Sequence, residues 1–67
     1  MELLRYFEYQ HLPAHLQDVS KPFHDLAARL AATLPDGSER TVAIRKLLEA
    51  KDAAVRSVAI DGQGVTK

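Results

Sequence analysis

Residues 26–47 read LAARLAATLPDGSERTVAIRKL, and this stretch decides the fold. Before Pro35, apolar residues recur at intervals of three and four, which is the stripe of an amphipathic helix that packs on one side. Extended one turn upstream, the stripe consists of Phe23, Leu26, Ala27, Leu30, Ala31 and Leu34. The run 35–37, Pro-Asp-Gly, then predicts a turn, because proline cannot continue the helix and an Asp-Gly pair suits a turn.

A second helix is expected directly after this turn. Asp36 and Glu39 resemble a capping box, Ser38 is an alternative N-cap, and Glu39 also suits the positive end of the helix dipole. Farther along, Asp52 and Arg56 are spaced to form an ion pair. The apolar residues fall on two faces, one with Ala43, Leu47, Ala50, Ala54 and Val58, the other with Ile44, Leu48 and Val55. One partner helix cannot cover both faces, so we interpret the second as a subunit contact.

The two ends of the chain complete the predicted architecture. Leu12 and Pro13 open a helical segment, which the run 20–22, Ser-Lys-Pro, is expected to kink or restart. Residues 1–9 are assigned a short helix, although they are too few for periodicity to decide. The sequence therefore predicts an all-α helical hairpin over residues 1–60, with a short N-terminal segment, a kinked first helix and a flexible C-terminal tail over 61–67.

The small size of the chain favours assembly. A protein of 67 residues buries only roughly 60% of the surface that its unfolded chain exposes. A core of this size rarely supplies more than about 3 to 5 kcal/mol, and natural proteins then add disulfides, a metal or subunit contacts. Because the sequence contains no cysteine, disulfides are excluded. We expect a homo-oligomer in a reducing compartment, the cytoplasm.

Several classes of function are disfavoured by composition and motifs. Nine basic residues balance nine acidic ones, so no large positive field attracts DNA or an anionic membrane. No segment approaches the roughly 20 apolar residues that span a bilayer, and residues 1–4 do not open a signal peptide. There is neither a glycine-rich phosphate loop nor a nucleophile set beside a base, so we expect no enzyme and no cofactor.

Histidines raise the question of a metal. His11 and His15 stand four residues apart, the spacing that presents two imidazoles to one ion on a helix, and His24 is available as a third ligand. Pro13 lies between the first two and weakens that geometry. Ordinary surface histidines explain the pattern better, so we expect no metal site.

Aromatic and basic residues form the more informative group. Tyr6, Phe7 and Tyr9 lie close together, and an aromatic face can stack on a nucleobase for about 1 to 3 kcal/mol. Phe7 is assigned to the core, whereas Tyr9 is a candidate for either core or ligand. Lys21, at the expected helix interruption, could meet a phosphate beside the free amides of a restarted helix, or could simply face solvent.

Four runs of sequence resemble the phage anti-CBASS and Thoeris anti-defence hairpin domain. They are FEYQHLP at 7–13, SKPFHDLA at 20–27, LP at 34–35 and ERTVAIRKLLEAKDAAVR at 39–56, and their combined order and spacing cover almost the whole chain. The resemblance implies a hexameric, non-enzymatic phage protein in the cytoplasm of the bacterial host. The implied function is that of a nucleotide sponge, a protein that sequesters the cyclic oligonucleotides made by bacterial immune cyclases. Related members trap cyclic ADP-ribose isomers.

The resemblance also implies binding residues. In that family, an aromatic of the F-x-Y type stacks on a base and a lysine at the first helix kink contacts phosphate, and the matching positions here are Tyr9 and Lys21. An arginine near the last helix is associated with a second, trinucleotide site, for which Arg40 and Arg45 both remain candidates. His11, close to Tyr9, completes the candidate set. Phe23 stands where some members have a small polar residue, which counts against a cyclic dinucleotide.

A second class of function stays open on the sequence alone. The second helix could make the protein an adaptor that binds a host or phage protein through an exposed face of Ile44, Leu48 and Val55. A DNA-binding protein ranks third, because the net charge is zero.

Overall fold

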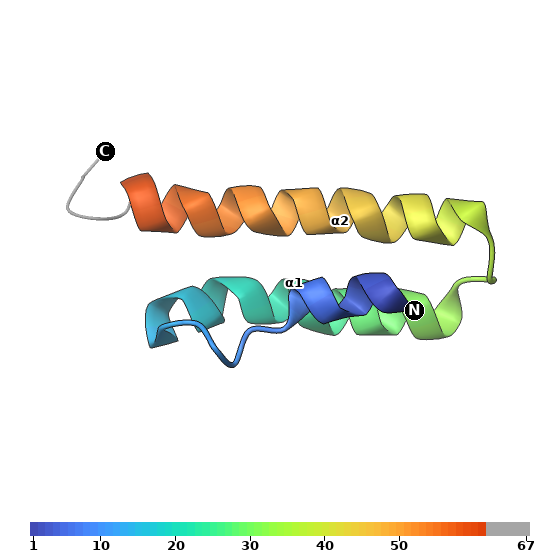
Figure 1. Cartoon of the computed structure of the whole chain (residues 1–67), viewed down its shortest axis with the longest axis horizontal. Coiled ribbons are helices and arrows are strands. Elements are labelled where there is room, and N and C mark those ends of the chain that lie inside the picture. Colours follow the sequence, from blue (N-terminus) through green and yellow to red (C-terminus); the bar gives the residue numbers. More distant parts are fainter. Residues whose placement is uncertain (62–67) are drawn as a thin grey trace.

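The computed structural model describes residues 1–61, and over that range the chain is a helical hairpin with a short helix laid along it (Figure 1). The 3-10 helix η1 spans Glu2–Phe7, and the α-helices α1 and α2 span Ala14–Thr33 and Ser38–Arg56. A π-helical turn, η2, continues α2 over Ser57–Asp61. The described residues contain no strand, so the all-α hairpin and the short N-terminal helix are confirmed.

α1 passes through Pro22 without a break. The predicted restart of the helix at residues 20–22 is therefore wrong, whereas the alternative, a kink at this place, stays a prediction. Proline offers no N–H to the carbonyl of Asp18, but both residues are exposed, so water can satisfy that carbonyl. As a consequence, Lys21 lies in the interior of a helix and not beside free N-terminal amides.

The turn between the helices is closed by Arg40. Its Nη1 donates a hydrogen bond to the backbone oxygen of Ala31 at 3.0 Å, and its Nη2 donates one to Asp36 Oδ1 at 2.9 Å. The first bond satisfies a carbonyl in the last turn of α1, where carbonyls lack helical partners. Arg40 thus links the end of α1 to the start of α2.

α2 begins without the side-chain cap that the sequence suggests. Gly37 occupies the N-cap position, and neither Asp36 nor Ser38 makes a capping hydrogen bond. The predicted capping box with Glu39 and the alternative Ser38 cap are both wrong, because the Asp36 carboxylate is held by Arg40 instead. Gly37 has φ 159° and ψ 179°, a conformation that essentially only glycine adopts, so the turn depends on this residue.

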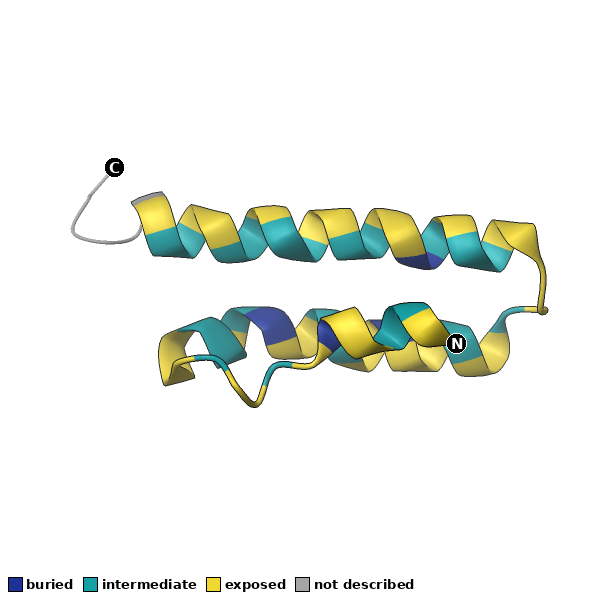
Figure 2. Cartoon of the chain, viewed as in Figure 1, coloured by how far each residue is buried: buried dark blue, intermediate teal, exposed yellow. Residues whose placement is uncertain are grey.

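The core is small and takes one fully buried apolar side chain from each main element. Phe7 of η1, Ala27 of α1 and Ile44 of α2 have no exposed surface (Figure 2). The partly buried side chains around them are Leu3, Leu4, Phe23, Leu30, Ala31, Leu47 and Leu48. This confirms Phe7 as a core residue and most of the stripe predicted on α1, although Leu26 is 43% exposed.

The second apolar face of α2 is covered by the chain itself. Ile44 is fully buried and Leu48 packs against the core, because η1 contacts α2 as well as α1. One partner helix indeed fails to cover both faces of α2, because η1 contacts this helix as well. Ile44 is buried within the protomer and is therefore not exposed to a docking partner, whereas the subunit contact through the second helix stays a prediction.

One predicted ion pair needs correction, and most of the expected C-terminal tail lies outside the described residues. Asp52 pairs with Lys51 at 2.9 Å and not with Arg56. η2 carries helical conformation to Asp61, one residue past the predicted domain end at residue 60, and residues 62–67 of the expected tail lie outside the described residues. None of the described helices is both long and apolar enough to span a bilayer.

Candidate functional site

Tyr9 is held at the junction between η1 and α1. Its backbone oxygen accepts a hydrogen bond from Leu12 N at 3.0 Å, which closes the turn that leads into α1. Its half-buried ring meets the ring of His24 edge to face, with centroids 5.1 Å apart and an interplanar angle of 67°. Such aromatic pairs add about 0.5 to 1.5 kcal/mol beyond the area they bury, so the Tyr9 ring is positioned and not merely exposed.

The carboxylate of Asp25 contacts both Lys21 and His24. Lys21 Nζ donates a hydrogen bond to Asp25 Oδ2 at 2.7 Å, and His24 Nδ1 lies 3.1 Å from Asp25 Oδ1. The hydrogen bonds from Lys21 and then from His24 lower the pKa of Asp25. The hydrogen bond to Asp25 raises the pKa of Lys21, with a smaller contribution from Tyr9. We call Tyr9, Lys21, His24 and Asp25 the Tyr9 cluster.

The Tyr9 cluster offers binding chemistry. The ring of Tyr9 contacts His24, and His24 and Lys21 engage the same carboxylate, so the two residues that the sequence singles out belong to one connected cluster of side chains. The Lys21–Asp25 pair is more than half exposed, and water and salt screen exposed pairs so that they contribute little to stability. An anion can therefore displace Asp25 from Lys21 at small cost, although the carboxylate remains a neighbour that repels it.

The two candidate arginines lie elsewhere. Arg40 is at the turn, where its donors bond to Ala31 and Asp36, and Ala31 follows Lys21 by ten residues, or roughly 15 Å along a helix. A hollow of about 300 Å³ lies over residues 34–40. Arg45 is exposed on α2. Arg40 therefore has a structural task, whereas Arg45 is available on the surface.

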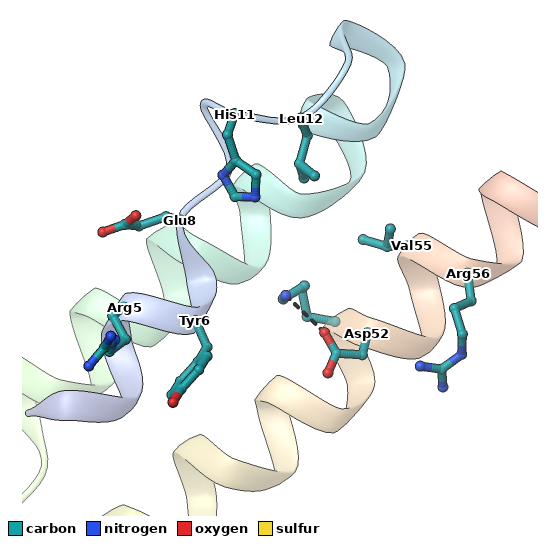
Figure 3. A pocket seen from close by; sticks show the side chains of 9 residues that line it. Arg5, Tyr6, Glu8, His11, Leu12, Asp52, Val55 and Arg56 are labelled. Atoms are coloured by element: carbon teal, nitrogen blue, oxygen red, sulfur yellow. Dashed lines mark ion pairs between the residues drawn. The ribbon is translucent and has the colours of Figure 1, made fainter.

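His11 belongs to a different place. It lines an open groove of about 380 Å³ between the N-terminal segment and the second half of α2 (Figure 3). Tyr6 contributes from the same side as His11, and Lys51, Asp52 and Val55 contribute from α2. Neither Tyr9 nor Lys21 lines this groove, so the five candidate residues are divided among separate parts of the protomer.

Sequence reasoning overlooked Lys51. Charges of both signs alternate along α2, which is typical of a solvated face, yet the Lys51 side chain is only 13% exposed. The available signal was its spacing, because Lys51 follows Ile44 by seven residues and Leu47 by four, which places it on the face that the core covers.

Within residues 1–61, no three histidine, aspartate or glutamate side chains gather in a way that could hold a metal ion. Comparison of the chain with protein-family models, with curated proteins and with solved structures found no match.

Proposed function

We propose that the protein is a non-enzymatic sponge that binds and sequesters a cyclic nucleotide signal of bacterial immunity. The supporting observation is the Tyr9 cluster, in which a positioned ring lies beside an exposed ammonium. A ring suits a nucleobase and an ammonium suits a phosphate. One ligand that carries both groups matches the two residues together, as the resemblance to the anti-defence hairpin domain also implies.

Assembly belongs to the proposal, because the Tyr9 cluster is open on the protomer. Only three apolar side chains are fully buried in the described part of the chain, which favours additional burial between copies. A homo-oligomer, and by resemblance a hexamer, would enclose the ligand between subunits. We assign the second ligand-contacting arginine to Arg45, which is exposed, and not to Arg40, whose donors maintain the turn.

The ligand class is a cyclic di- or trinucleotide or a cyclic ADP-ribose isomer, bound in the cytoplasm of the bacterial host. Titration calorimetry with a panel of these compounds tests the proposal. The cognate ligand should bind and be recovered chemically unchanged. Binding at a hundredfold excess over Kd should also stabilise the folded protein by about 2.7 kcal/mol in a thermal-shift assay. If no member of the panel binds, the sponge proposal is wrong.

Variants connect the binding to the Tyr9 cluster. Tyr9→Ala should remove a stack of about 1 to 3 kcal/mol, and Lys21→Ala a charge-assisted hydrogen bond of about 1.5 to 3 kcal/mol. Tyr9→Phe is the matched control, because the ring survives the loss of the hydroxyl. Salt separates the two contributions, since ionic strength weakens the lysine contact and leaves stacking nearly unchanged. Unchanged affinity in both alanine variants, with fold and oligomer intact, would place the ligand elsewhere.

A further inference from the structure

The groove that contains His11 has the dimensions of a small-molecule site. Its volume of about 380 Å³ falls within the range of roughly 300 to 1,000 Å³ that is typical of ligand sites. The N-terminal segment forms one side and α2 the other. Figure 3 shows the side chains of Tyr6 and His11 directed from the N-terminal segment toward α2. Two rings from one segment thus face a helix across a hollow.

Lys51 gives the groove an unusual cation. Lysine side chains are rarely covered, yet Lys51 is only 13% exposed, and its partner Asp52 is 48% exposed. Most of the Lys51 side chain is thus covered, while the carboxylate that pairs with its ammonium is about half exposed. Because the covered stem restricts the side chain, the ammonium is held at the groove with less freedom to lose on binding than a solvated lysine, and an anion there competes with Asp52 for it.

Tyr6 supplies an aromatic surface in the same groove. Its side chain is 55% exposed, and the Arg5 guanidinium lies over the ring, 5.6 Å from the centroid. This cation–π contact covers one face of the ring and leaves the other for a planar ligand. Arg5, Lys51 and Arg56 line the groove against two carboxylates, Glu8 and Asp52, so the lining has a small positive excess even with His11 neutral.

We propose that this groove binds a planar ring that carries one phosphate, a ligand of the size of a nucleoside monophosphate. The ring packs on Tyr6, and the phosphate is met by Lys51, with His11 as a further donor. The small positive excess of the lining suits a single phosphate and not a polyanion. The site shares no residue with the Tyr9 cluster, so it does not rest on the proposed sponge function.

The test uses the full chain and three probes: adenosine monophosphate, adenosine and inorganic phosphate. Backbone amide NMR titration should show shifts for groove residues with adenosine monophosphate, and each fragment should bind at least about tenfold more weakly, since ring and phosphate contribute separately. Tyr6→Phe should keep the affinity and Tyr6→Ala should lower it. Equal affinity for adenosine monophosphate and inorganic phosphate would overturn the proposal, because it would mean non-specific attraction of an anion.

Matched variants identify the phosphate contact. Lys51→Met keeps the apolar stem and removes the charge, and it should weaken binding about tenfold. Lys46→Met removes the same charge from an exposed position on α2 outside the groove and should change nothing. Equal effects of the two substitutions would contradict the assignment of the phosphate contact to Lys51. If circular dichroism finds Lys51→Met unfolded, two exposed histidines provide the test instead. His11→Ala should weaken binding, and His15→Ala, outside the groove, should not. Equal effects of these two substitutions would again contradict the proposal.

A final variant separates this site from the Tyr9 cluster. Tyr9→Ala should retain the wild-type affinity for adenosine monophosphate even where it loses the cyclic nucleotide. If Tyr9→Ala abolishes binding of adenosine monophosphate, the groove is not its site, and the sponge proposal is unaffected. Conversely, if no cyclic nucleotide binds, the measured binding of adenosine monophosphate at the groove is unaffected.

Discussion

Asp25 Oδ2 accepts a hydrogen bond from Lys21 Nζ at 2.7 Å, one turn earlier on α1, while its other carboxylate oxygen lies 3.1 Å from His24 Nδ1. One carboxylate therefore engages both polar side chains beside Tyr9. Because the pair is exposed, this engagement adds little to stability. Its main consequence concerns ligands, since Asp25 competes with any anion for Lys21.

Removal of this competitor should strengthen binding of an anionic ligand at the Tyr9 cluster. Asp25→Asn keeps the shape of the side chain and removes its charge, so we expect a small gain in affinity, of at most about fivefold in Kd. Calorimetry at two ionic strengths measures it, and the gain should shrink in high salt. Glu49→Gln, an exposed change on α2, is the control and should leave Kd unaltered. Weaker binding by Asp25→Asn would instead assign the carboxylate a positioning role.

The same pair predicts how stability depends on pH. The pKa of Asp25 is lowered in the folded state by the hydrogen bond from Lys21, so its contribution is present above the pKa of the unfolded chain and is lost as pH falls through the folded pKa. The pKa of Lys21 is raised from 10.5, so its contribution is complete below that value and is lost as pH rises through the folded pKa.

Urea unfolding as a function of pH measures both limbs. Asp25→Asn should flatten the acid limb below about pH 4 only slightly, because the pair is exposed, and should flatten the alkaline limb to a similar small extent, since Lys21 loses its partner. Lys21→Met should give the same two changes. An acid limb that stays as steep in both variants would show that other carboxylates carry it.

Arg40 should matter for stability and Arg45 should not. Arg40→Met keeps the stem but removes the hydrogen bonds to Ala31 O and Asp36, and bonds that involve a charged group contribute about 1.5 to 3 kcal/mol. We expect a loss of that order in the free energy of unfolding. Arg45→Met changes an exposed residue and should stay within about 0.5 kcal/mol. Similar losses in both variants would mean that Arg40 does not hold the turn.

The hairpin could be predicted because its signals are local. The stripe on α1 and the run at residues 35–37 each fix nearby backbone, and Phe7 stands out as the large apolar residue of the N-terminal segment. The docking of η1 onto α2 could not be predicted, since six residues show no useful period and the contact joins distant parts of the chain. Without that contact, the face with Ile44 and Leu48 resembles an unpartnered surface.

Side-chain partners at the candidate sites were harder to predict for a similar reason. Spacing predicts a capping role for Asp36, because spacing considers only the residues at the start of the helix. In the structure, Arg40 instead donates a hydrogen bond to the Asp36 carboxylate. The nearness of Tyr9 to Lys21 follows from the chain reversal between η1 and α1, which sequence spacing does not encode. Their pairing as ligand residues rests on resemblance, while their proximity rests on the fold.

Leu48→Lys tests the place of the second face of α2. Because Leu48 is partly buried and packs against the core formed by Phe7, Ala27 and Ile44, a charge there should destabilise the protomer itself and not merely separate subunits. Circular dichroism should show lost helicity, and light scattering should show no folded monomer. Val42→Lys, on the exposed part of α2, is the control and should keep full helicity. A folded monomeric Leu48→Lys would support the subunit-contact interpretation.

Pro22 should be the easiest position at which to stabilise the protein. It lies inside α1, where proline removes one helical hydrogen bond and costs about 3 kcal/mol relative to alanine. Proline also stiffens the unfolded chain, which offsets up to about 1 kcal/mol. Pro22→Ala should therefore raise the free energy of unfolding by about 2 kcal/mol, measured by urea denaturation.

The control for Pro22 is the other proline beside the same helix. Pro13 precedes Ala14 at the N-cap of α1, where its missing N–H has no helical partner to lose, and its carbonyl already accepts hydrogen bonds from Leu16 and Gln17 at 2.9 Å. Pro13→Ala should therefore bring no gain and a small loss, because it only loosens the unfolded chain. If both substitutions shift the urea midpoint equally, the effect comes from the unfolded state. If Pro22→Ala destabilises the protein, the proline ring makes contacts that outweigh the missing hydrogen bond to Asp18.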